Sequence, residues 1–245
     1  MKTRSKILGV IPARFDSQRL PGKVLRNIGD KAVLHWVYER ARESPLLKKL
    51  FVATDSEKVR LYCEANCIPV MMTAQHLSGS DRLHEVMERT DGDIYVNLQG
   101  DEPTLRPEHI ELLLRPILAK ESEVTTLKVA IKLADAQDAN CVKVVTDNRG
   151  HALYFSRLPI PFNRDPSGGI KFYKHIGLYG YTREALVLFH NLPQSSLELT
   201  EKLEQLRLLE NGIGIQVCET PFDTVGVDTE ADLNKATAFL LGSKA

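Results

Sequence analysis

The chain has 245 residues, of which 43% are hydrophobic and 26% are charged, as is ordinary for a soluble globular protein. Its 32 basic side chains match 32 acidic ones, so the basic excess of a protein that binds duplex nucleic acid is missing. No apolar run has the length of a membrane span or of a secretion signal. We therefore expect a cytoplasmic protein with neither nucleic acid nor membrane as a partner.

Short apolar runs alternate with helical patterns through the first half of the chain. The first run, Ile7–Pro12, predicts a buried strand, because strands covered on both faces are apolar throughout. Further strands are expected over 50–53, 69–72 and 94–98, and helices over 31–43, 56–66 and 81–90. This alternation predicts an α/β fold with parallel strands and right-handed crossovers.

The second half of the chain is less regular. Residues 142–146 and 152–156 flank a polar turn and predict a hairpin, and residues 175–181 alternate like a strand. Helices are expected over 199–211 and 229–241, the last one capped at Asp228 or Thr229. A connector over 158–172, with Pro159, Pro161 and Pro166, is expected to be mobile. We expect one domain over 1–245 with an inserted subdomain at roughly 150–210.

Three permanent cations follow the first predicted strand. Arg14, Arg19 and Lys23 lie on the loop after Pro12, and such loops are where α/β folds bind ligands. Two unit charges ~4 Å apart interact by about 4 kcal/mol at a protein surface, so gathered cations favour a strongly anionic ligand such as a triphosphate. A solvated basic loop is the structural alternative.

Two glycine motifs do not fit the nucleotide sites that they suggest. Gly22-Lys23 is followed by Val24, where a Walker A motif has Ser or Thr. Gly212-Ile213-Gly214 lies between a predicted helix and a strand, the reverse of the order in a dinucleotide site. Neither a P-loop NTPase nor a dehydrogenase is supported.

Acidic residues follow the predicted strand at 94–98. Asp101 and Glu102 lie there in the segment Asn97–Pro103, which as structure alone is a strand-to-loop turn. Asp228, far along the chain, is explained by helix capping but is also a possible second metal ligand beside Asp101. Mg²⁺ typically takes one or two carboxylates together with substrate phosphates.

Two other polar segments have both a structural and a functional interpretation. Residues 78–82 form a small-residue turn that enters a helix, in which Ser80 or Asp81 is the expected N-cap. In the helix expected over 199–211, a polar face lies opposite the leucine stripe and either meets solvent or hydrogen-bonds a polyhydroxylated substrate. The residues of this polar face are Glu201, Glu204 and Gln205.

Loop cations, strand-end acids and the lack of a catalytic triad together favour phosphoryl-type chemistry. Several motifs, spread in order over nearly the whole chain, then resemble one family, the 3-deoxy-manno-octulosonate (Kdo) cytidylyltransferases. These motifs are Ile11–Arg14, Arg19–Lys23, Gln99–Pro103, Ala152–Arg157, His175–Gly177, Leu203–Arg207 and Val227–Thr229.

The resemblance implies a nucleotidyltransferase, Rossmann-like fold with a mixed, largely parallel central sheet flanked by helices. It also implies a homodimer, with the inserted subdomain as the place of dimerisation, and a requirement for Mg²⁺. The implied reaction converts CTP and Kdo to CMP-Kdo and pyrophosphate for lipopolysaccharide biosynthesis. The alternatives are an 8-amino-Kdo cytidylyltransferase and a nucleotide-binding module without catalysis.

The resemblance also implies roles for individual residues. Asp101 and Asp228 would hold the metal, and Arg14, Lys23 and Asp101 would be catalytic. The nucleotide site would comprise Ala13, Arg14, Arg19, Lys23, Ser78, Gly79, Arg82 and Gln99. The sugar acid would meet Arg157, His175, Glu204 and Gln205. Asp16 departs from the family pattern and could pair with Arg14 or Arg19.

Overall fold

The computed structural model describes residues 5–17, 19–76, 78–165 and 169–242. The chain forms two compact units: unit 1 comprises residues 1–111 and 224–245, and unit 2 comprises residues 112–223. The boundary falls within helix α4 (Pro107–Leu118). Unit 2 thus contains the segment at 150–210 and begins well before it. Residues 166–168 of the connector expected to be mobile lie outside the described residues.

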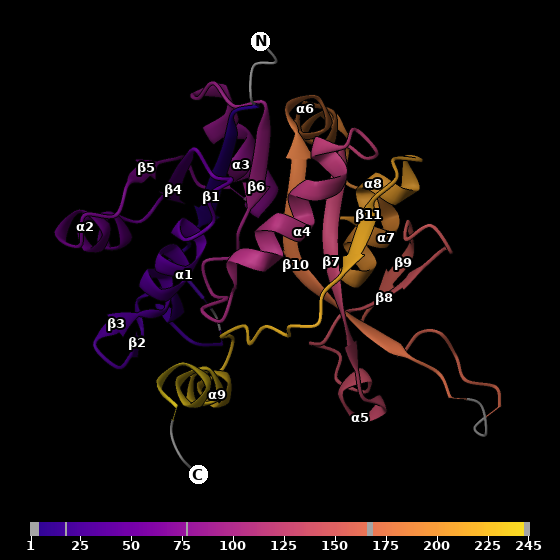
Figure 1. Cartoon of the computed structure of the whole chain (residues 1–245). Helices are drawn as coiled ribbons and strands as arrows, with labels where there is room; N and C mark the ends of the chain where they lie inside the picture. Colours follow the sequence, from indigo (N-terminus) through magenta and orange to yellow (C-terminus); the bar gives the residue numbers. More distant parts are fainter. Residues whose placement is uncertain (1–4, 18, 77, 166–168, 243–245) are drawn as a thin grey trace. The chain divides into compact units, whose positions relative to one another are not determined.

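Unit 1 contains a parallel sheet (Figure 1). Its strands lie in the order β6 (Ile94–Asn97), β1 (Ile7–Pro12), β4 (Lys49–Thr54) and β5 (Val70–Met72). Helices α1 (Val33–Arg42), α2 (Glu57–Ala65) and α3 (Gly79–Glu88) connect these strands and pack on them. Ile7–Ile11 are all buried, as predicted for a strand covered on both faces.

The rest of unit 1 is held by a small apolar cluster. After β1 come the 3₁₀ turn η1 (Lys23–Leu25) and a hairpin of β2 (Asn27–Ile28) and β3 (Lys31–Ala32). Helix α9 (Glu230–Leu241) closes the unit and is capped by the Thr229 side chain, one of the two caps predicted. The cluster comprises Leu20, Ile28, Val33, Val227, Leu233 and Ala236.

Unit 2 has its own strands. β7 (Val124–Ile131) pairs antiparallel with β10 (Phe172–Thr182) and parallel with β11 (Gln216–Glu219). The predicted hairpin is confirmed as β8 (Lys143–Thr146) and β9 (Ala152–Ser156). Helices α5 (Leu133–Ala136) and α6 (Arg183–Asn191) follow β7 and β10. With parallel and antiparallel pairs both present, the α/β class with a mixed sheet is confirmed.

The helix predicted over 199–211 is wrong. The chain forms two short helices instead, α7 (Ser196–Glu201) and α8 (Leu206–Glu210). Lys202 ends α7 in the left-handed conformation, with φ at 55°. The break directs Arg207 back to α7, where it forms a bidentate ion pair with Glu198 in which each side chain is 7% exposed. The single polar helix face expected on 199–211 therefore does not exist.

No helix among residues 5–17, 19–76, 78–165 and 169–242 combines the length and apolarity needed to cross a membrane.

Candidate active site

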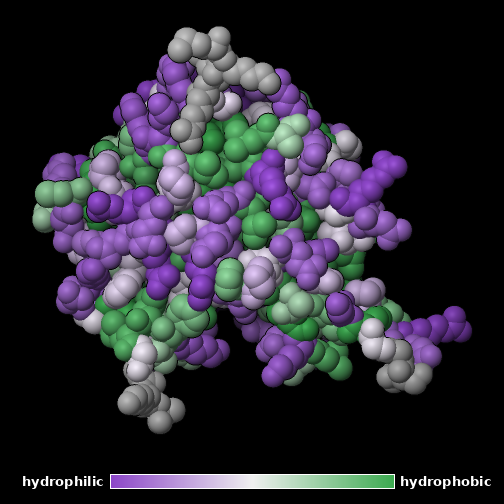
Figure 2. Space-filling model, viewed as in Figure 1, coloured by the Kyte–Doolittle hydropathy of each residue, from purple (hydrophilic) through white to green (hydrophobic). Residues whose placement is uncertain are grey.

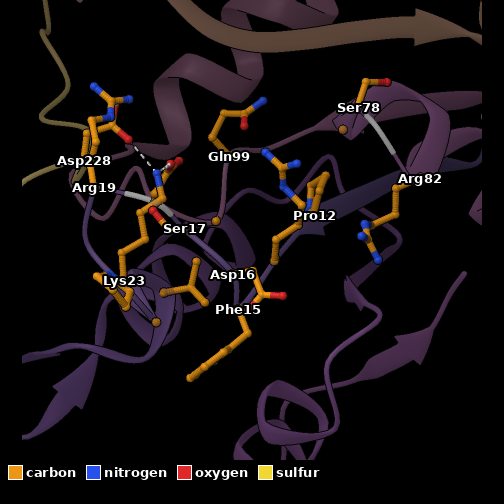
Figure 3. Close-up of a pocket in the computed structure, with 17 residues that line it drawn as sticks. Pro12, Phe15, Asp16, Ser17, Arg19, Lys23, Ser78, Arg82, Gln99 and Asp228 are labelled. Atoms are coloured by element: carbon orange, nitrogen blue, oxygen red, sulfur yellow. Dashed lines mark hydrogen bonds and ion pairs between the residues drawn. The ribbon is translucent and has the colours of Figure 1, made fainter. Parts of the chain in front are cut away.

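A cavity of about 740 Å³ lies in unit 1, where the loops after β1 and β6 meet the start of α3 (Figure 3). The carboxyl ends of neighbouring parallel strands meet at one edge of a sheet, which explains why segments distant in sequence converge here. The lining includes every unit 1 residue assigned to the site by resemblance except Ala13. These lining residues are Arg14, Arg19, Lys23, Ser78, Gly79, Arg82, Gln99, Asp101 and Asp228.

The backbone around the cavity is fixed by close contacts. Ala13 is fully buried, and its N–H donates to the Ala53 carbonyl at 2.9 Å, which fixes the start of the loop against β4. Gly100 allows the β6 loop to approach β1, because a Cβ at this position would lie 2.8 Å from the carbonyl oxygen of Pro12. Gly22 has φ at 66°, which favours glycine and turns the chain into Lys23.

Asp101 and Asp228 are brought together by hydrogen bonds between their segments. The Val227 N–H donates to the Asp101 carbonyl at 2.8 Å, and the Val225 N–H donates to Thr104 Oγ1 at 2.7 Å. Val227 is also a member of the apolar cluster, which anchors the segment that carries Asp228. Two acids that lie far apart in sequence are therefore brought to the same cavity.

Lys23 forms ion pairs with both Asp101 and Asp228. Its Nζ contacts Asp101 Oδ2 and lies 2.7 Å from Asp228 Oδ1, while the Arg19 guanidinium lies 2.9 Å from Asp228 Oδ2. Burial favours the neutral amine, but the two carboxylates outweigh it and raise the pKa of Lys23. Burial acts against the Asp228 carboxylate, yet Lys23 and Arg19 lower its pKa. Lys23 and Asp228 are therefore held in their charged forms at neutral pH.

Asp16 does not form the pairing considered for it with Arg14 or Arg19. Asp16 is exposed at the cavity rim, and no ion pair involves it within the described part of the chain. Arg19 pairs with Asp228 instead, and the two side chains lie next to each other at the cavity (Figure 3). Arg14 likewise forms no ion pair with a described residue, which leaves its guanidinium available to an anion.

Sequence reasoning missed Asp55. This residue follows β4, and its Oδ1 forms an ion pair with Nη2 of Arg82 at 3.1 Å. The Arg82 guanidinium also donates a hydrogen bond to Thr73 Oγ1. The Arg82 side chain is only 1% exposed, and burial lowers its pKa despite the attraction of Asp55. An acid directly after a buried parallel strand was the signal that pointed to Asp101, and it applies equally to Asp55.

The cap of α3 is also corrected. Ser78, and neither Ser80 nor Asp81, is the N-cap: its Oγ accepts a hydrogen bond from the Asp81 N–H at 3.0 Å. Ser78 therefore combines a structural role with a position in the cavity wall. The start of α3 presents its positive dipole end there, which suits an anionic ligand.

Replacing Asp55 by asparagine is expected to lower the free energy of unfolding by about 2 kcal/mol, since a buried guanidinium loses its countercharge. The apparent KM for CTP, the substrate that the resemblance implies, should rise as Arg82 loses its fixed position. Urea denaturation and steady-state kinetics measure the two effects. Glu64→Gln is the control, because the exposed Arg60–Glu64 pair contributes little to stability. Unchanged unfolding in Asp55→Asn would show that Arg82 is held by other contacts.

The aspartate pair suits a divalent cation. Within residues 5–17, 19–76, 78–165 and 169–242, no three His, Cys, Asp or Glu side chains gather as a metal site. Two carboxylates alone fit Mg²⁺, which completes its octahedron with water and substrate phosphates. The position between Asp101 and Asp228 already attracts a cation, since the Lys23 ammonium contacts both carboxylates.

The residues assigned to the sugar acid lie in unit 2. His175 Nε2 lies 3.0 Å from Thr126 Oγ1 and 3.0 Å from Tyr179 Oη. Glu204 lies near enough to Tyr179 to help raise the pKa of that phenol, although burial is the larger cause. Gln205 is 4% exposed, and its Nε2 has no hydrogen-bond partner among the described residues. Buried and partly buried polar groups are therefore found at these positions, with Tyr179 as a member that sequence reasoning missed.

Arg157 is held by the backbone. Its Nε donates to the Glu201 carbonyl at 2.7 Å and its Nη1 to the Ala139 carbonyl at 3.0 Å. The Glu201 carboxylate in turn accepts from Ser156 Oγ and from the Arg157 N–H. Glu201 therefore supports Arg157, a role that differs from both the solvent exposure and the substrate contact considered for it.

His175 makes stability depend on pH. Burial lowers its pKa to about 3, with Lys174 adding to the effect, whereas in the unfolded chain it titrates near ~6.5. The unfolded state therefore binds more protons between these values, and stability is lost as the pH falls below about 6.5. The slope of the unfolding free energy against pH reports how many more protons the unfolded state binds than the folded state. In His175→Gln this number should fall by about one at pH 5. Urea denaturation at pH 5, 6 and 7 measures this, with His151→Gln, which alters a half-exposed histidine, as the control.

Comparisons with known proteins point in one direction. Residues 8–216 match the family model described as cytidylyltransferase. The 3-deoxy-manno-octulosonate cytidylyltransferase of Koribacter versatilis is 48% identical over 96% of this chain and 90% of its own length. The protein of that name from Acidobacterium capsulatum is 49% identical over 97% and 98%. The structure of CMP:2-keto-3-deoxy-manno-octonic acid synthetase complexed with CTP superposes with a TM-score of 0.92 at 44% identity, covering 98% of this chain and 100% of that one.

Proposed function

Because the chain belongs to the 3-deoxy-manno-octulosonate cytidylyltransferase family, we propose that the cavity in unit 1 binds CTP and that the residues of this cavity perform the transfer of CMP to Kdo. The enzyme is a nucleotidyltransferase that converts CTP and Kdo to CMP-Kdo and pyrophosphate. We assign this role to the cavity because three cations of one loop line it together with Asp101 and Asp228.

We assign the triphosphate to the cations of the loop after β1. Arg14 is an exposed guanidinium without an ion pair to any described residue, and Arg19 and Lys23 lie beside it in the lining. The remaining lining residues border the cytidine, with Ala13 behind them. These are Ser78, Gly79, Arg82 and Gln99.

The reaction is an in-line attack of the anomeric hydroxyl of the sugar on the α-phosphorus of CTP. The new P–O bond forms as the bond to pyrophosphate breaks, and the hydroxyl proton leaves to solvent. Arg14 and Lys23 stabilise the charge that builds on the α-phosphate and the leaving pyrophosphate, because fixed cations need no reorganisation as the reaction proceeds. No side chain among the lining residues is required as a nucleophile.

Asp101 and Asp228 are the proposed ligands of Mg²⁺. A bound Mg²⁺ supplies Lewis-acid polarisation of the phosphate and lowers the pKa of a coordinated hydroxyl. The part of the protein is to hold two carboxylates at one point, which the Val227–Asp101 backbone hydrogen bond does.

For the sugar acid we propose the buried polar groups of unit 2. Gln205 offers an amide N–H without a partner among the described residues, and His175 is a neutral imidazole suited to hydrogen bonding with hydroxyl groups. Glu204 accepts hydrogen bonds from sugar hydroxyls, and Arg157 reads the carboxylate. Arg157 must exchange a backbone carbonyl partner to do so.

We further propose that the enzyme is a homodimer that works in the cytoplasm, where CTP is made. A second copy of the chain is the expected occupant of an exposed apolar segment in unit 2. Leu158 is 71% exposed and Phe162 is 86% exposed, the highest values among the large apolar side chains of the described residues. Sedimentation velocity on the enzyme and on Phe162→Ser tests the dimer, which the variant should weaken.

Pyrophosphate release from CTP tests the function directly. We expect release with Kdo, little with 8-amino-Kdo or sialate, and none without a sugar. Faster release with 8-amino-Kdo would identify that sugar as the substrate. No release with any sugar, while CTP still binds, would indicate a nucleotide-binding module without catalysis.

A further inference from the structure

Lys23 occupies the position that a metal ion would need. Its ammonium contacts Asp101 and lies 2.7 Å from Asp228, so a divalent cation bound to both carboxylates would stand within a few ångströms of a third positive charge. At such separations a charge of two repels a charge of one by several kcal/mol even at a surface dielectric. The ammonium and the metal therefore cannot share the two acids.

The cluster is electrically balanced before any ligand arrives. Two cations, Lys23 and Arg19, meet two carboxylates, Asp101 and Asp228, so the net charge is zero. The Lys23 and Asp101 side chains are 15% and 26% exposed, and partly buried pairs are screened less than surface pairs. A free divalent cation gains little attraction from acids whose charge is already compensated.

The backbone of Lys23 is held in place by a hydrogen bond, whereas its side chain is long and flexible. The Lys23 N–H donates to the Leu20 carbonyl at 3.1 Å within the turn after Gly22. Four methylenes then separate this fixed backbone from the ammonium, and lysine acts as a point charge on a flexible stem. The stem lines the same cavity as Arg14, so the ammonium can leave the acids for a triphosphate without moving the loop.

We propose that Lys23 is an internal counter-ion that keeps the metal site closed until the nucleotide arrives, so that metal and CTP bind cooperatively. This inference rests on the proposed function. The triphosphate attracts Lys23 and Arg19 away from Asp101 and Asp228, which are then free to bind the metal. By linkage, the metal must raise the affinity for the nucleotide by the same factor. Lys23 thus has two roles: it weakens metal binding in the absence of nucleotide, and it stabilises negative charge during the reaction.

The test measures metal binding without nucleotide. Mn²⁺ is titrated into the free enzyme, and unbound Mn²⁺ is followed by its electron paramagnetic resonance signal. Lys23→Met, which keeps the length of the side chain and removes its charge, is expected to bind Mn²⁺ at least about tenfold more tightly than the unmodified enzyme. Arg19→Met should give a smaller gain, because its pair with Asp228 is about half exposed.

Two controls define where the metal binds. Arg26→Met removes a positive charge from the same unit, but Arg26 pairs with Glu230 and does not line the cavity, so Mn²⁺ affinity should not change. Adding Asp101→Asn to Lys23→Met should abolish the gain. Lys23→Gln is a second neutral variant, in case Lys23→Met unfolds.

The outcomes separate the two proposals. If the neutral variants at Lys23 bind Mn²⁺ no more tightly than the unmodified enzyme while Asp101→Asn still removes metal-dependent turnover, the counter-ion proposal is overturned and the metal site stands. If Asp101→Asn leaves metal-dependent turnover intact, the metal site itself is wrong, and the counter-ion proposal fails with it.

Discussion

Lys23→Ala is expected to lower the turnover number by roughly 10²–10³, the usual cost of removing one preorganised charge donor from a transition state. The fall in kcat reflects the charge that builds on the α-phosphate and pyrophosphate as the bond breaks, and the KM for CTP should rise as well, because Lys23 also binds the triphosphate before the reaction. Initial rates of pyrophosphate release at saturating CTP and Kdo measure it.

The matched control for Lys23 is Arg26→Ala. Arg26 is three residues away in the same turn, but its guanidinium lies 2.9 Å from Glu230 and outside the cavity lining. We expect this variant to keep nearly full activity. A Lys23→Ala enzyme that folds normally and turns over at a similar rate would remove Lys23 from the mechanism.

Asp101→Asn is expected to remove most of the Mg²⁺-dependent turnover, a fall on the order of 10² or more. The substitution keeps the shape of the side chain and its link to Lys23 but replaces a carboxylate with a far weaker ligand for a hard cation. The Val227–Asp101 hydrogen bond uses the backbone carbonyl and is retained, so the fold should not change. Rates measured across a Mg²⁺ titration give the result.

Asp91→Asn serves as the control for Asp101, since Asp91 is an exposed carboxylate in an ion pair with Lys6. Its Mg²⁺ dependence should match that of the unmodified enzyme. If Asp101→Asn also responds to Mg²⁺ normally, another group must hold the metal.

The first half of the fold could be predicted because its signals are local. Buried parallel strands such as Ile7–Pro12 are apolar throughout. Charged residues on the loops after them therefore indicate a ligand-binding site. The same logic identified Arg14, Lys23 and Asp101, and the structure places all three in one cavity. Topology then explains why residues far apart in sequence converge.

The failures have physical causes that periodicity does not report. The pattern over 199–211 is helical, but the Glu198–Arg207 ion pair needs the chain to turn back at Lys202. The strand Val124–Ile131 was missed because its polar residues, such as Thr125 and Thr126, are buried and satisfied by tertiary hydrogen bonds. Asp55 follows a buried strand just as Asp101 does, but its own segment does not show that Arg82 is its partner, so it was missed.

The apolar cluster of unit 1 has a consequence for the nucleotide site. Leu20 lies on the cation loop and Val227 precedes Asp228, while Leu233 and Ala236 come from α9. No residue of α9 lines the cavity, yet the two segments that carry its charges rest on that helix. Binding of CTP should therefore slow amide hydrogen exchange in α9 at a distance from the ligand. Conversely, a substitution that loosens α9 should weaken CTP binding, because both charged segments of the proposed nucleotide site pack against this helix.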